Sequence, residues 1–233
     1  MRLLRFLIMG WTLLPMLAAT AIADENAFES IFNGKTLEGW EAVPKETAGD
    51  WSVENQTIKG IGTHKRQAFL VYKDHGIKDF ELKFSYRLHG KGNTGVDLRT
   101  RPDKTGKRIF EAYHADIGHP GIGDHILGVW DFHFATRKEF PFKRGTRFWI
   151  NPDQSSHTKN IPNALTKNDV RPDEWNHVHV IMIGNTGQFY INGKLSAEFT
   201  DNHPDYFAKG AIALQIHDPG VKVEFKNILL RRL

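Results

Sequence analysis

Residues 81–88 read ELKFSYRL, and this stretch decides the class of fold. Its apolar residues occupy every second position from Leu82 onward, so they fall on one face of an extended chain, and the polar residues fall on the other. A period of two predicts a strand of an antiparallel sheet with one face buried and one face in water. The apolar side also fixes the register of this strand.

The same period recurs in other short stretches that are bounded by Gly, Asn, Asp or Pro, namely 96–101, 177–183, 211–217 and 221–225. Asn192-Gly193 is a strong hairpin signal, and it predicts a meander of three strands over 177–183, 188–191 and 194–199. Sustained helical periods are nearly absent. We therefore expect an all-β chain.

Residues 130–173 lack a clear period and are rich in Arg, Lys, Pro and Asn. We expect a long loop here. Two interpretations stay open: a functional rim, since long loops are uncommon unless they have a role, or an insertion that covers a sheet edge.

The start of the chain predicts export. Two arginines precede an apolar run at 6–19, and the small-residue tripeptide Ala-Ile-Ala at 21–23 follows. The apolar run is shorter than the roughly 20 residues of a membrane-spanning helix. We expect a signal peptide at 1–23 and one domain at 24–233, periplasmic or secreted, with no membrane span.

Composition limits the class of partner. The formal net charge of +4 falls by two if the arginines of the signal leave, so nucleic acid is not implied. The chain has no cysteine, and its fold must rest on packing, hydrogen bonds or a bound cation. Sixteen Phe and six Trp are enough for the core of one large β-sandwich.

The stretch 211–217 is the most informative candidate for a site. Small residues, Ala211 and Ala213, share a face with Gln215 and His217, which leaves room for a ligand beside an amide and an imidazole. These two groups suit the binding of hydroxyls or the transfer of a proton. A solvated strand would show the same pattern.

Charged residues mark two further strands. Asp97, Arg99 and Arg101 alternate with apolar residues and are expected on one face. In 109–116, Glu111 is the best carboxylate candidate, either as a catalytic group or as the partner of an arginine in a structural ion pair.

Strand parity places Tyr113 on the side of Glu111, with His114 opposite and Asp116 at the end of the strand. The spacings of His114, His119 and His125 match no metal motif, so no metal ligand is predicted. A divalent cation could still take part, since carboxylates and imidazoles are available ligands.

Several short motifs, taken in order, resemble one known family over nearly the whole chain after residue 23. The family is that of the 3-keto-disaccharide hydrolase domains, also called DUF1080. The motifs are FNGKTLEGW at 32–40, WSVENQTIKG at 51–60, FELKF at 80–84, GNTGVDLR at 92–99, FE at 110–111 with Asp116, EWN at 174–176, NG at 192–193, LQIH at 214–217 and VEFKNI at 223–228.

The resemblance implies a concanavalin-like jelly roll, a sandwich of two antiparallel sheets with a concave polar face. It implies that the sugar site is lined by Arg99, Glu111, Asp116, Gln215 and His217. We add Asp97, Tyr113 and Trp130 as candidate substrate contacts, although the two aromatic rings would equally suit the core.

Two departures from the family put the substrate in question. Tyr113 stands where the family has Gln in a Glu-x-Gln stretch, and 130–173 replaces a shorter connection.

For a 3-keto glycoside, the resemblance suggests proton abstraction at C2, elimination of the C1 group and addition of water. We assign His217 or Glu111 as the base, Arg99 with Gln215 at the oxyanion, and Asp116 as an acid or orienting group. Arg99→Ala and Glu111→Gln should then lose turnover and retain the fold.

A non-catalytic carbohydrate-binding module of the same architecture is the main alternative, since a fold does not fix a function. A conventional glucanase would need a closely matched carboxylate pair such as Glu-x-Asp-x-x-Glu, and the sequence has none. The expected partner is a sugar or glycoside.

Overall fold

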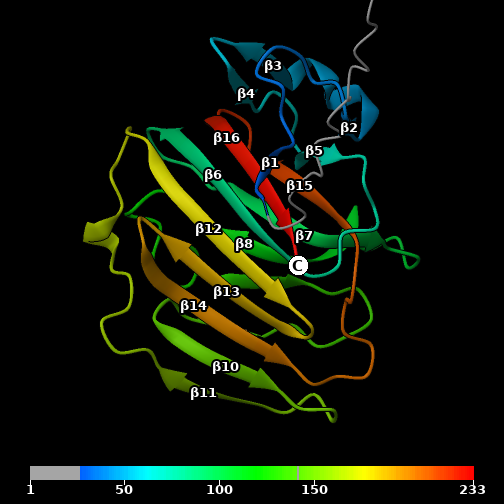
Figure 1. Cartoon of the computed structure of the whole chain (residues 1–233), viewed down its shortest axis with the longest axis vertical. Coiled ribbons are helices and arrows are strands. Elements are labelled where there is room, and N and C mark those ends of the chain that lie inside the picture. The colour runs from blue at the N-terminus through cyan, green and yellow to red at the C-terminus, as the bar shows by residue number, and fades with distance from the viewer. Residues whose placement is uncertain (1–26, 141) are drawn as a thin grey trace, which may run out of the picture.

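Two β-sheets packed face to face make up the molecule (Figure 1). The computed structural model describes residues 27–140 and 142–233. The segment expected to be a signal peptide, 1–23, lies outside these residues. The predicted all-β sandwich is confirmed.

The larger sheet has ten strands and the smaller sheet has six. In spatial order the larger sheet contains β11 (Ser156–Asn160), β10 (Thr146–Ile150), β14 (Lys194–Asp201), β13 (Thr186–Ile191), β12 (Asn176–Ile183), β6 (Phe80–His89), β16 (Lys222–Arg232), β4 (Thr57–Ile61) and β3 (Trp51–Glu54), with β1 (Glu29–Ser30) beside β16. The smaller sheet contains β2 (Trp40–Val43), β5 (Ala68–Tyr72), β15 (Ala211–Ile216), β7 (Gly95–Pro102), β8 (Phe110–Asp116) and β9 (Trp130–His133). Two short 3-10 helices are described, η1 (Lys45–Asp50) and η2 (Lys167–Asp169).

β6 has the register that its sequence predicts. The apolar residues at alternate positions from Phe80 to Leu88 are buried, and they face the smaller sheet. On the neighbouring strand β12, Val178 pairs with Phe84 and Val180 pairs with Leu82. The apolar faces of the two strands therefore coincide and form one wall of the core.

The predicted meander of β12, β13 and β14 is confirmed. The turn between β13 and β14 has Asn192 at a φ of 50° and Gly193 at a φ of 79°. Positive φ at both central residues is the conformation in which Asn-Gly closes a two-residue hairpin. The order of these strands in the larger sheet follows their order along the chain.

The prediction of a long loop over 130–173 is wrong, because the segment contains β9, β10, β11 and η2. β9 and β10 were not predicted because each has only four or five residues and the segment around them is rich in Pro, Lys and Arg. β11 is exposed at every position and has no apolar face to detect. It pairs with β10 at the edge of the larger sheet.

The outer face of the smaller sheet, directed away from the core, positions the candidate site. On β15, Ile212, Leu214 and Ile216 enter the main core, as predicted. Ala211 and Ala213 point the other way and pack with Phe69 and Val71 of β5. Both alanines are fully buried in this second apolar cluster, so the space expected above them is filled by neighbouring side chains.

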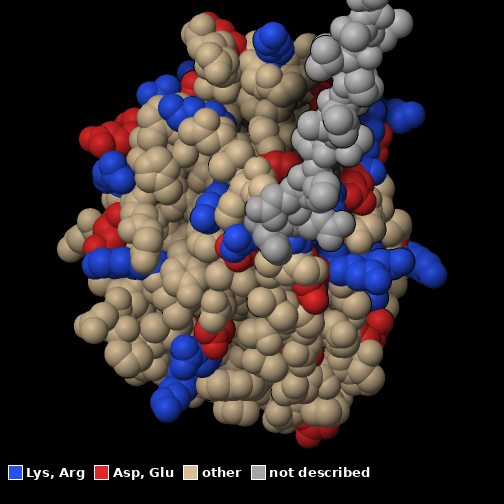
Figure 2. Space-filling model, viewed as in Figure 1, with Lys and Arg blue, Asp and Glu red and all other residues tan. Residues whose placement is uncertain are grey.

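Two observations concern the surface. On the face shown in Figure 2, which carries β12 to β14, basic and acidic side chains are interspersed, and neither sign forms a continuous patch. Among the described residues, no helix is both long enough and apolar enough to cross a membrane.

Candidate active site

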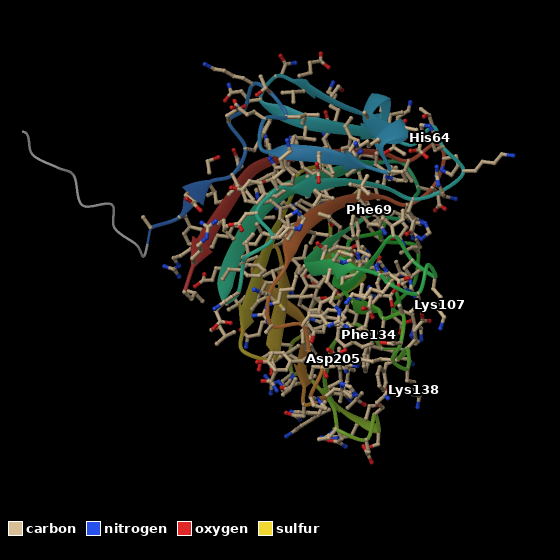
Figure 3. All side chains as sticks on the ribbon, turned by 90° about the vertical axis from the view of Figure 1, so that its right-hand side faces the viewer. His64, Phe69, Lys107, Phe134, Lys138 and Asp205 are labelled. Carbon is tan, nitrogen blue, oxygen red and sulfur yellow. The ribbon has the colours of Figure 1, made fainter. Side chains whose placement is uncertain are left out.

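A cavity of 540 Å³ lies beside the outer face of the smaller sheet. We call it the histidine cavity, and its lining comes from 65–67, Phe69, 106–110, His133 and 217–218. Phe69 and Lys107 of this lining are labelled on the side of the molecule that Figure 3 shows. Ligand pockets commonly measure about 300–1,000 Å³, so the cavity is large enough for a sugar.

Three buried groups from three neighbouring strands meet next to this cavity: Asp97 of β7, His114 of β8 and His133 of β9. We call them the Asp–His cluster. Nδ1 of His114 lies 2.5 Å from Oδ1 of Asp97, and Nδ1 of His133 lies 3.3 Å from the same oxygen. The two imidazoles stack at a centroid distance of 4.5 Å. One carboxylate therefore faces both rings.

A second carboxylate faces the far nitrogen of each imidazole. Nε2 of His114 lies 3.1 Å from Oδ1 of Asp116, and Nε2 of His133 lies 3.5 Å from Oδ2 of Asp131. The sequence produces this pattern directly, because His114 and Asp116 are two residues apart on β8, and Asp131 and His133 are two residues apart on β9. All of these side chains consequently share the outer face.

Electrostatics favour charged forms throughout the cluster. Burial lowers the pKa of His114, but the carboxylates of Asp116 and Asp97 outweigh it and hold this pKa well above its ordinary value. Burial also lowers the pKa of His133, and Asp97 reverses the shift, with a net rise. Burial raises the pKa of Asp97, but the two imidazoles bring it below its ordinary value.

Gly95 makes room for His114. A Cβ atom at this position of β7 would overlap the imidazole of His114 and also crowd the carbonyl oxygen of Ala115. The ring thus lies directly over the backbone of the neighbouring strand, where any other residue would displace it.

Some buried polar atoms near the cluster have no partner among the described residues. They are Oδ2 of Asp97 and both amide atoms of Gln215, whose side chains are fully buried. Gln215 lies on the outer face two residues beyond Ala213, which pairs with Asp97. Because an unpaired buried polar group costs about 1–3 kcal/mol, such groups are typical of a site that completes its hydrogen bonds with a ligand.

His217 stands in the wall of the histidine cavity, directly after β15. Its side chain is 35% exposed, and its Nδ1 lies 2.8 Å from Oδ2 of Asp218, although the two groups are not oriented for a hydrogen bond. A solvent-accessible imidazole beside a carboxylate can accept or donate a proton. The predicted placement of Gln215 and His217 on one side of the strand agrees with these positions.

Arg99 lies elsewhere, and the prediction that it shares a face with Asp97 is wrong. The pairing of β7 with β8 shifts register between Leu98 and Arg101, and Arg99 has a φ of 50°. This bulge breaks the alternation that the sequence suggests. The fully buried guanidinium donates to the carbonyl oxygens of Lys78, Gly184 and Phe207 and to the carboxylate of Asp79.

Glu111 is also absent from the histidine cavity. Its carboxylate accepts hydrogen bonds from Nε of Arg101 at 2.9 Å and from the backbone N–H of Ala135 at 3.0 Å. Arg101 in turn donates a bidentate pair of hydrogen bonds to the carboxylate of Asp205. These three charged residues line a different cavity of 500 Å³, which we call the Arg101 cavity. Of the two interpretations left open for Glu111, the structure agrees with the second, a structural ion pair with an arginine.

Three further predicted positions can now be placed. Asp116, which the sequence put at the end of a strand, lies on the outer face beside His114. Tyr113 and Trp130 are fully buried in the core, where each packs against Phe199. They cannot contact a sugar in the histidine cavity, and the prediction that they bind substrate is wrong.

Sequence reasoning missed His133, Asp131 and Lys107. The first two lie in the segment taken for a loop, although the alternation of polar and aromatic residues in WDFH at 130–133 carried the signal of a strand. His119 and His125, named beside His114 in the sequence, make hydrogen bonds to backbone groups of Gly121 and Phe142 instead. The partner of His114 is thus a histidine from the next strand.

Comparison with known proteins identifies relatives. Residues 27–231 match the family described as the 3-keto-alpha-glucoside-1,2-lyase-like domain. A stretch of 99 residues is 29% identical to a 3-keto-disaccharide hydrolase of Bacteroides thetaiotaomicron. This stretch covers 38% of the chain and 34% of the relative, so the match spans about a third of that protein's length.

Solved structures share the fold. One is a protein assigned to the glycosyl hydrolases from Parabacteroides distasonis, with a TM-score of 0.60 and 18% identity over 88% of this chain and 94% of the other. Another is the carbohydrate-binding module CBM66 of Bacillus subtilis, with a TM-score of 0.50 and 16% identity over 83% and 95% of the two chains. With the family match over most of its length, the chain belongs to the 3-keto-alpha-glucoside-1,2-lyase-like domain family.

Proposed function

We propose that this protein is an exported carbohydrate-active hydrolase that cleaves 3-keto glycosides. Membership of the family and the name of the Bacteroides relative support the substrate class. The observation that carries the proposal is the histidine cavity, which is lined by both His217 and Lys107, has an accessible imidazole at His217 and is large enough for a sugar. Export rests on the signal pattern of residues 1–23.

The chemistry follows from the ketone. A carbonyl at C3 acidifies the proton on C2, so a base can remove it while the electron pair forms an enolate. The C1–O bond then breaks, the leaving oxygen takes a proton, and a C1=C2 double bond remains. Water adds its hydroxyl to C1 and a proton to C2, so the net reaction is hydrolysis, and the protein needs a base near C2 and a cation near the ketone oxygen.

His217 fits the role of the base. It lines the cavity, its imidazole is partly accessible, and the carboxylate of Asp218 can stabilise the imidazolium once a proton has been taken. Glu111, the other candidate, is engaged by Arg101 in a separate cavity. The choice between the two bases therefore falls on His217.

Lys107 takes the place first assigned to Arg99. It lines the cavity, and its Nζ donates to the carbonyl oxygen of Ala135 at 3.0 Å. Arg108 is committed to Glu139 and to the carbonyl oxygen of Phe134. Of these two neighbouring cations, Lys107 is thus the freer one to stabilise an enolate. Gln215 is fully buried and outside the lining of the cavity, so the role first given to it at the oxyanion is not kept.

The test compares a 3-keto glucoside with its unoxidised parent and follows release of the aglycone. We expect release from the keto substrate alone, a large loss of turnover in Lys107→Met, and no loss in the control Lys104→Met, which removes an exposed lysine of the same loop. Glycan binding without release from either substrate would instead indicate a carbohydrate-binding module. Release from the parent glucoside would show that the ketone has no role.

A further inference from the structure

The Asp–His cluster has the composition and layout of a metal site. Two imidazoles and one carboxylate offer three ligand atoms that all lie within 4.8 Å of one another. This set of donors suits divalent transition metals, which bind imidazole nitrogen and carboxylate oxygen at about 2.0–2.2 Å. We propose that Asp97, His114 and His133 form a binding site for one divalent transition-metal ion.

The outer carboxylates support this assignment independently. In metal sites, a histidine ligand usually donates its second ring N–H to a carboxylate or carbonyl, which fixes the ring and its tautomer. Both histidines have such a partner: Nε2 of His114 faces Asp116, and Nε2 of His133 faces Asp131. The two Nδ1 atoms are consequently the ones left to face Asp97, and they are the ligand atoms of the site.

The unpaired polar atoms point to the same place. Oδ2 of Asp97 is buried and has no partner among the described residues, while Oδ1 of the same carboxylate faces both rings. An ion between the rings would take the place of their Nδ1 protons and use an oxygen of Asp97. The cavity gives access, since His133 lines it. The unpartnered amide of Gln215 lies on the same face of the sheet.

Binding requires a small rearrangement. The rings are nearly parallel, with an angle of 18° between their planes, and an ion bound by both must lie in the plane of each. His133 is the freer ring, because its contacts of 3.3 and 3.5 Å are longer than the 2.5 Å contact of His114. We expect the stack to open at His133 when the ion enters.

The experiment measures binding without any sugar, so its outcome is separate from that of the proposed function. The chain is treated with chelator, dialysed and titrated with Co²⁺ by visible absorption and with Zn²⁺ by calorimetry. We expect one ion per chain, competition between the two metals, and loss of the site in Asp97→Asn and His133→Gln.

Graded variants sharpen the test. Asp116→Asn alters only an outer partner and should weaken binding about 10–100-fold. His125→Gln removes an exposed histidine outside the cluster and should bind as the wild type does. Absence of binding in the wild-type chain would overturn the proposal, as would unchanged affinity in Asp97→Asn or His133→Gln.

A measurement on the wild-type chain covers the case in which a ligand variant fails to fold. Proton NMR of the Co²⁺ form should show two exchangeable, paramagnetically shifted imidazole N–H signals, one from Nε2 of each ligand. One signal or none would contradict a site built on His114 and His133.

Discussion

The histidine cavity and the Arg101 cavity both adjoin β8 and the loop between β7 and β8, yet the charged groups in or beside them are satisfied to different degrees. In the Arg101 cavity, Arg101 engages both Glu111 and Asp205, and the other oxygen of Glu111 accepts a backbone N–H. Next to the histidine cavity, Oδ2 of Asp97 and the amide of Gln215 are buried without partners among the described residues.

Whether buried polar groups are paired distinguishes a structural cavity from a ligand site better than the presence of charged residues does. Both cavities have similar volumes, and a carboxylate that the sequence marks as notable lies in the Arg101 cavity, Glu111, and next to the histidine cavity, Asp97. A closed set of ion pairs stabilises the fold and has little capacity left for a ligand. Unpaired buried groups weaken the fold by themselves, so they indicate where a ligand or ion completes the hydrogen bonds.

The largest effect should come from Arg99→Ala. The substitution leaves buried carbonyl oxygens without a donor and Asp79 without its cation, so we expect the free energy of unfolding to fall by about 3–5 kcal/mol. Urea unfolding measures this loss, with Arg66→Ala, which removes an exposed ion pair, as the control. Retained stability with lost turnover would restore Arg99 to the catalytic role that the sequence suggested.

The next largest effect should be on turnover, which shows which of the two cavities carries the chemistry. His217→Asn should lower kcat for the 3-keto glucoside about 10²–10⁴-fold, the usual contribution of a general base. Glu111→Gln, which keeps a hydrogen-bond acceptor for Ala135, should leave the turnover of folded protein within about tenfold. His75→Asn, at an exposed histidine, is the matched control. The opposite ranking of the His217 and Glu111 variants would place the chemistry in the Arg101 cavity.

A smaller effect concerns the position of His114. Gly95→Ala forces a Cβ into the imidazole and should destabilise the protein by about 1–3 kcal/mol, as overpacking commonly does. Gly49→Ala serves as the control, since a Cβ there meets no atom within 4 Å. Thermal unfolding of the two variants gives the comparison, and equal midpoints would show that His114 moves aside without cost.

The smallest effect is a pH dependence in the Arg101 cavity. The hydrogen bond from Arg101 holds the pKa of Asp205 below its ordinary value, and burial opposes it. A depressed folded-state pKa contributes stability above the unfolded-state value of about 3.9, and this is lost as pH falls through the folded-state pKa. The contribution is small because the carboxylate is 53% exposed.

An NMR titration reads this pKa directly. Arg101→Gln should raise the pKa of Asp205 toward its ordinary value, and the acid-side loss of stability from this group should then become smaller and be complete at a higher pH. An unchanged titration would mean that Arg101 does not interact with Asp205 in solution.

Alternation predicted the strands that have one apolar face. β6, β12 and β15 match their predicted positions within a residue or so, because the core selects one face of each. β11 could not be found in this way, since none of its side chains is buried. Its place depends on hydrogen bonds to β10, which leave no mark in the pattern of side chains.

Alternation also located some residues of the candidate site and missed others. Gln215 lies on the face of β15 that the alternation predicts, and His217, directly after the strand, lies on the same side. In β7, by contrast, the bulge between Leu98 and Arg101 interrupts the alternation of faces. The residue types in this stretch give no sign of the bulge. The pairing of His114 with His133 depends on which strand lies beside β8, and that is decided by the whole sheet.

The position of β16 has a consequence for the order in which the molecule can assemble. This strand, the last along the chain, lies between β6 and β4 in the interior of the larger sheet, and it also pairs with β1 (Figure 1). Pairings between segments so distant in sequence form slowly. During synthesis the sheet therefore keeps an unfilled gap until its final strand emerges, and the growing polypeptide remains open until that moment.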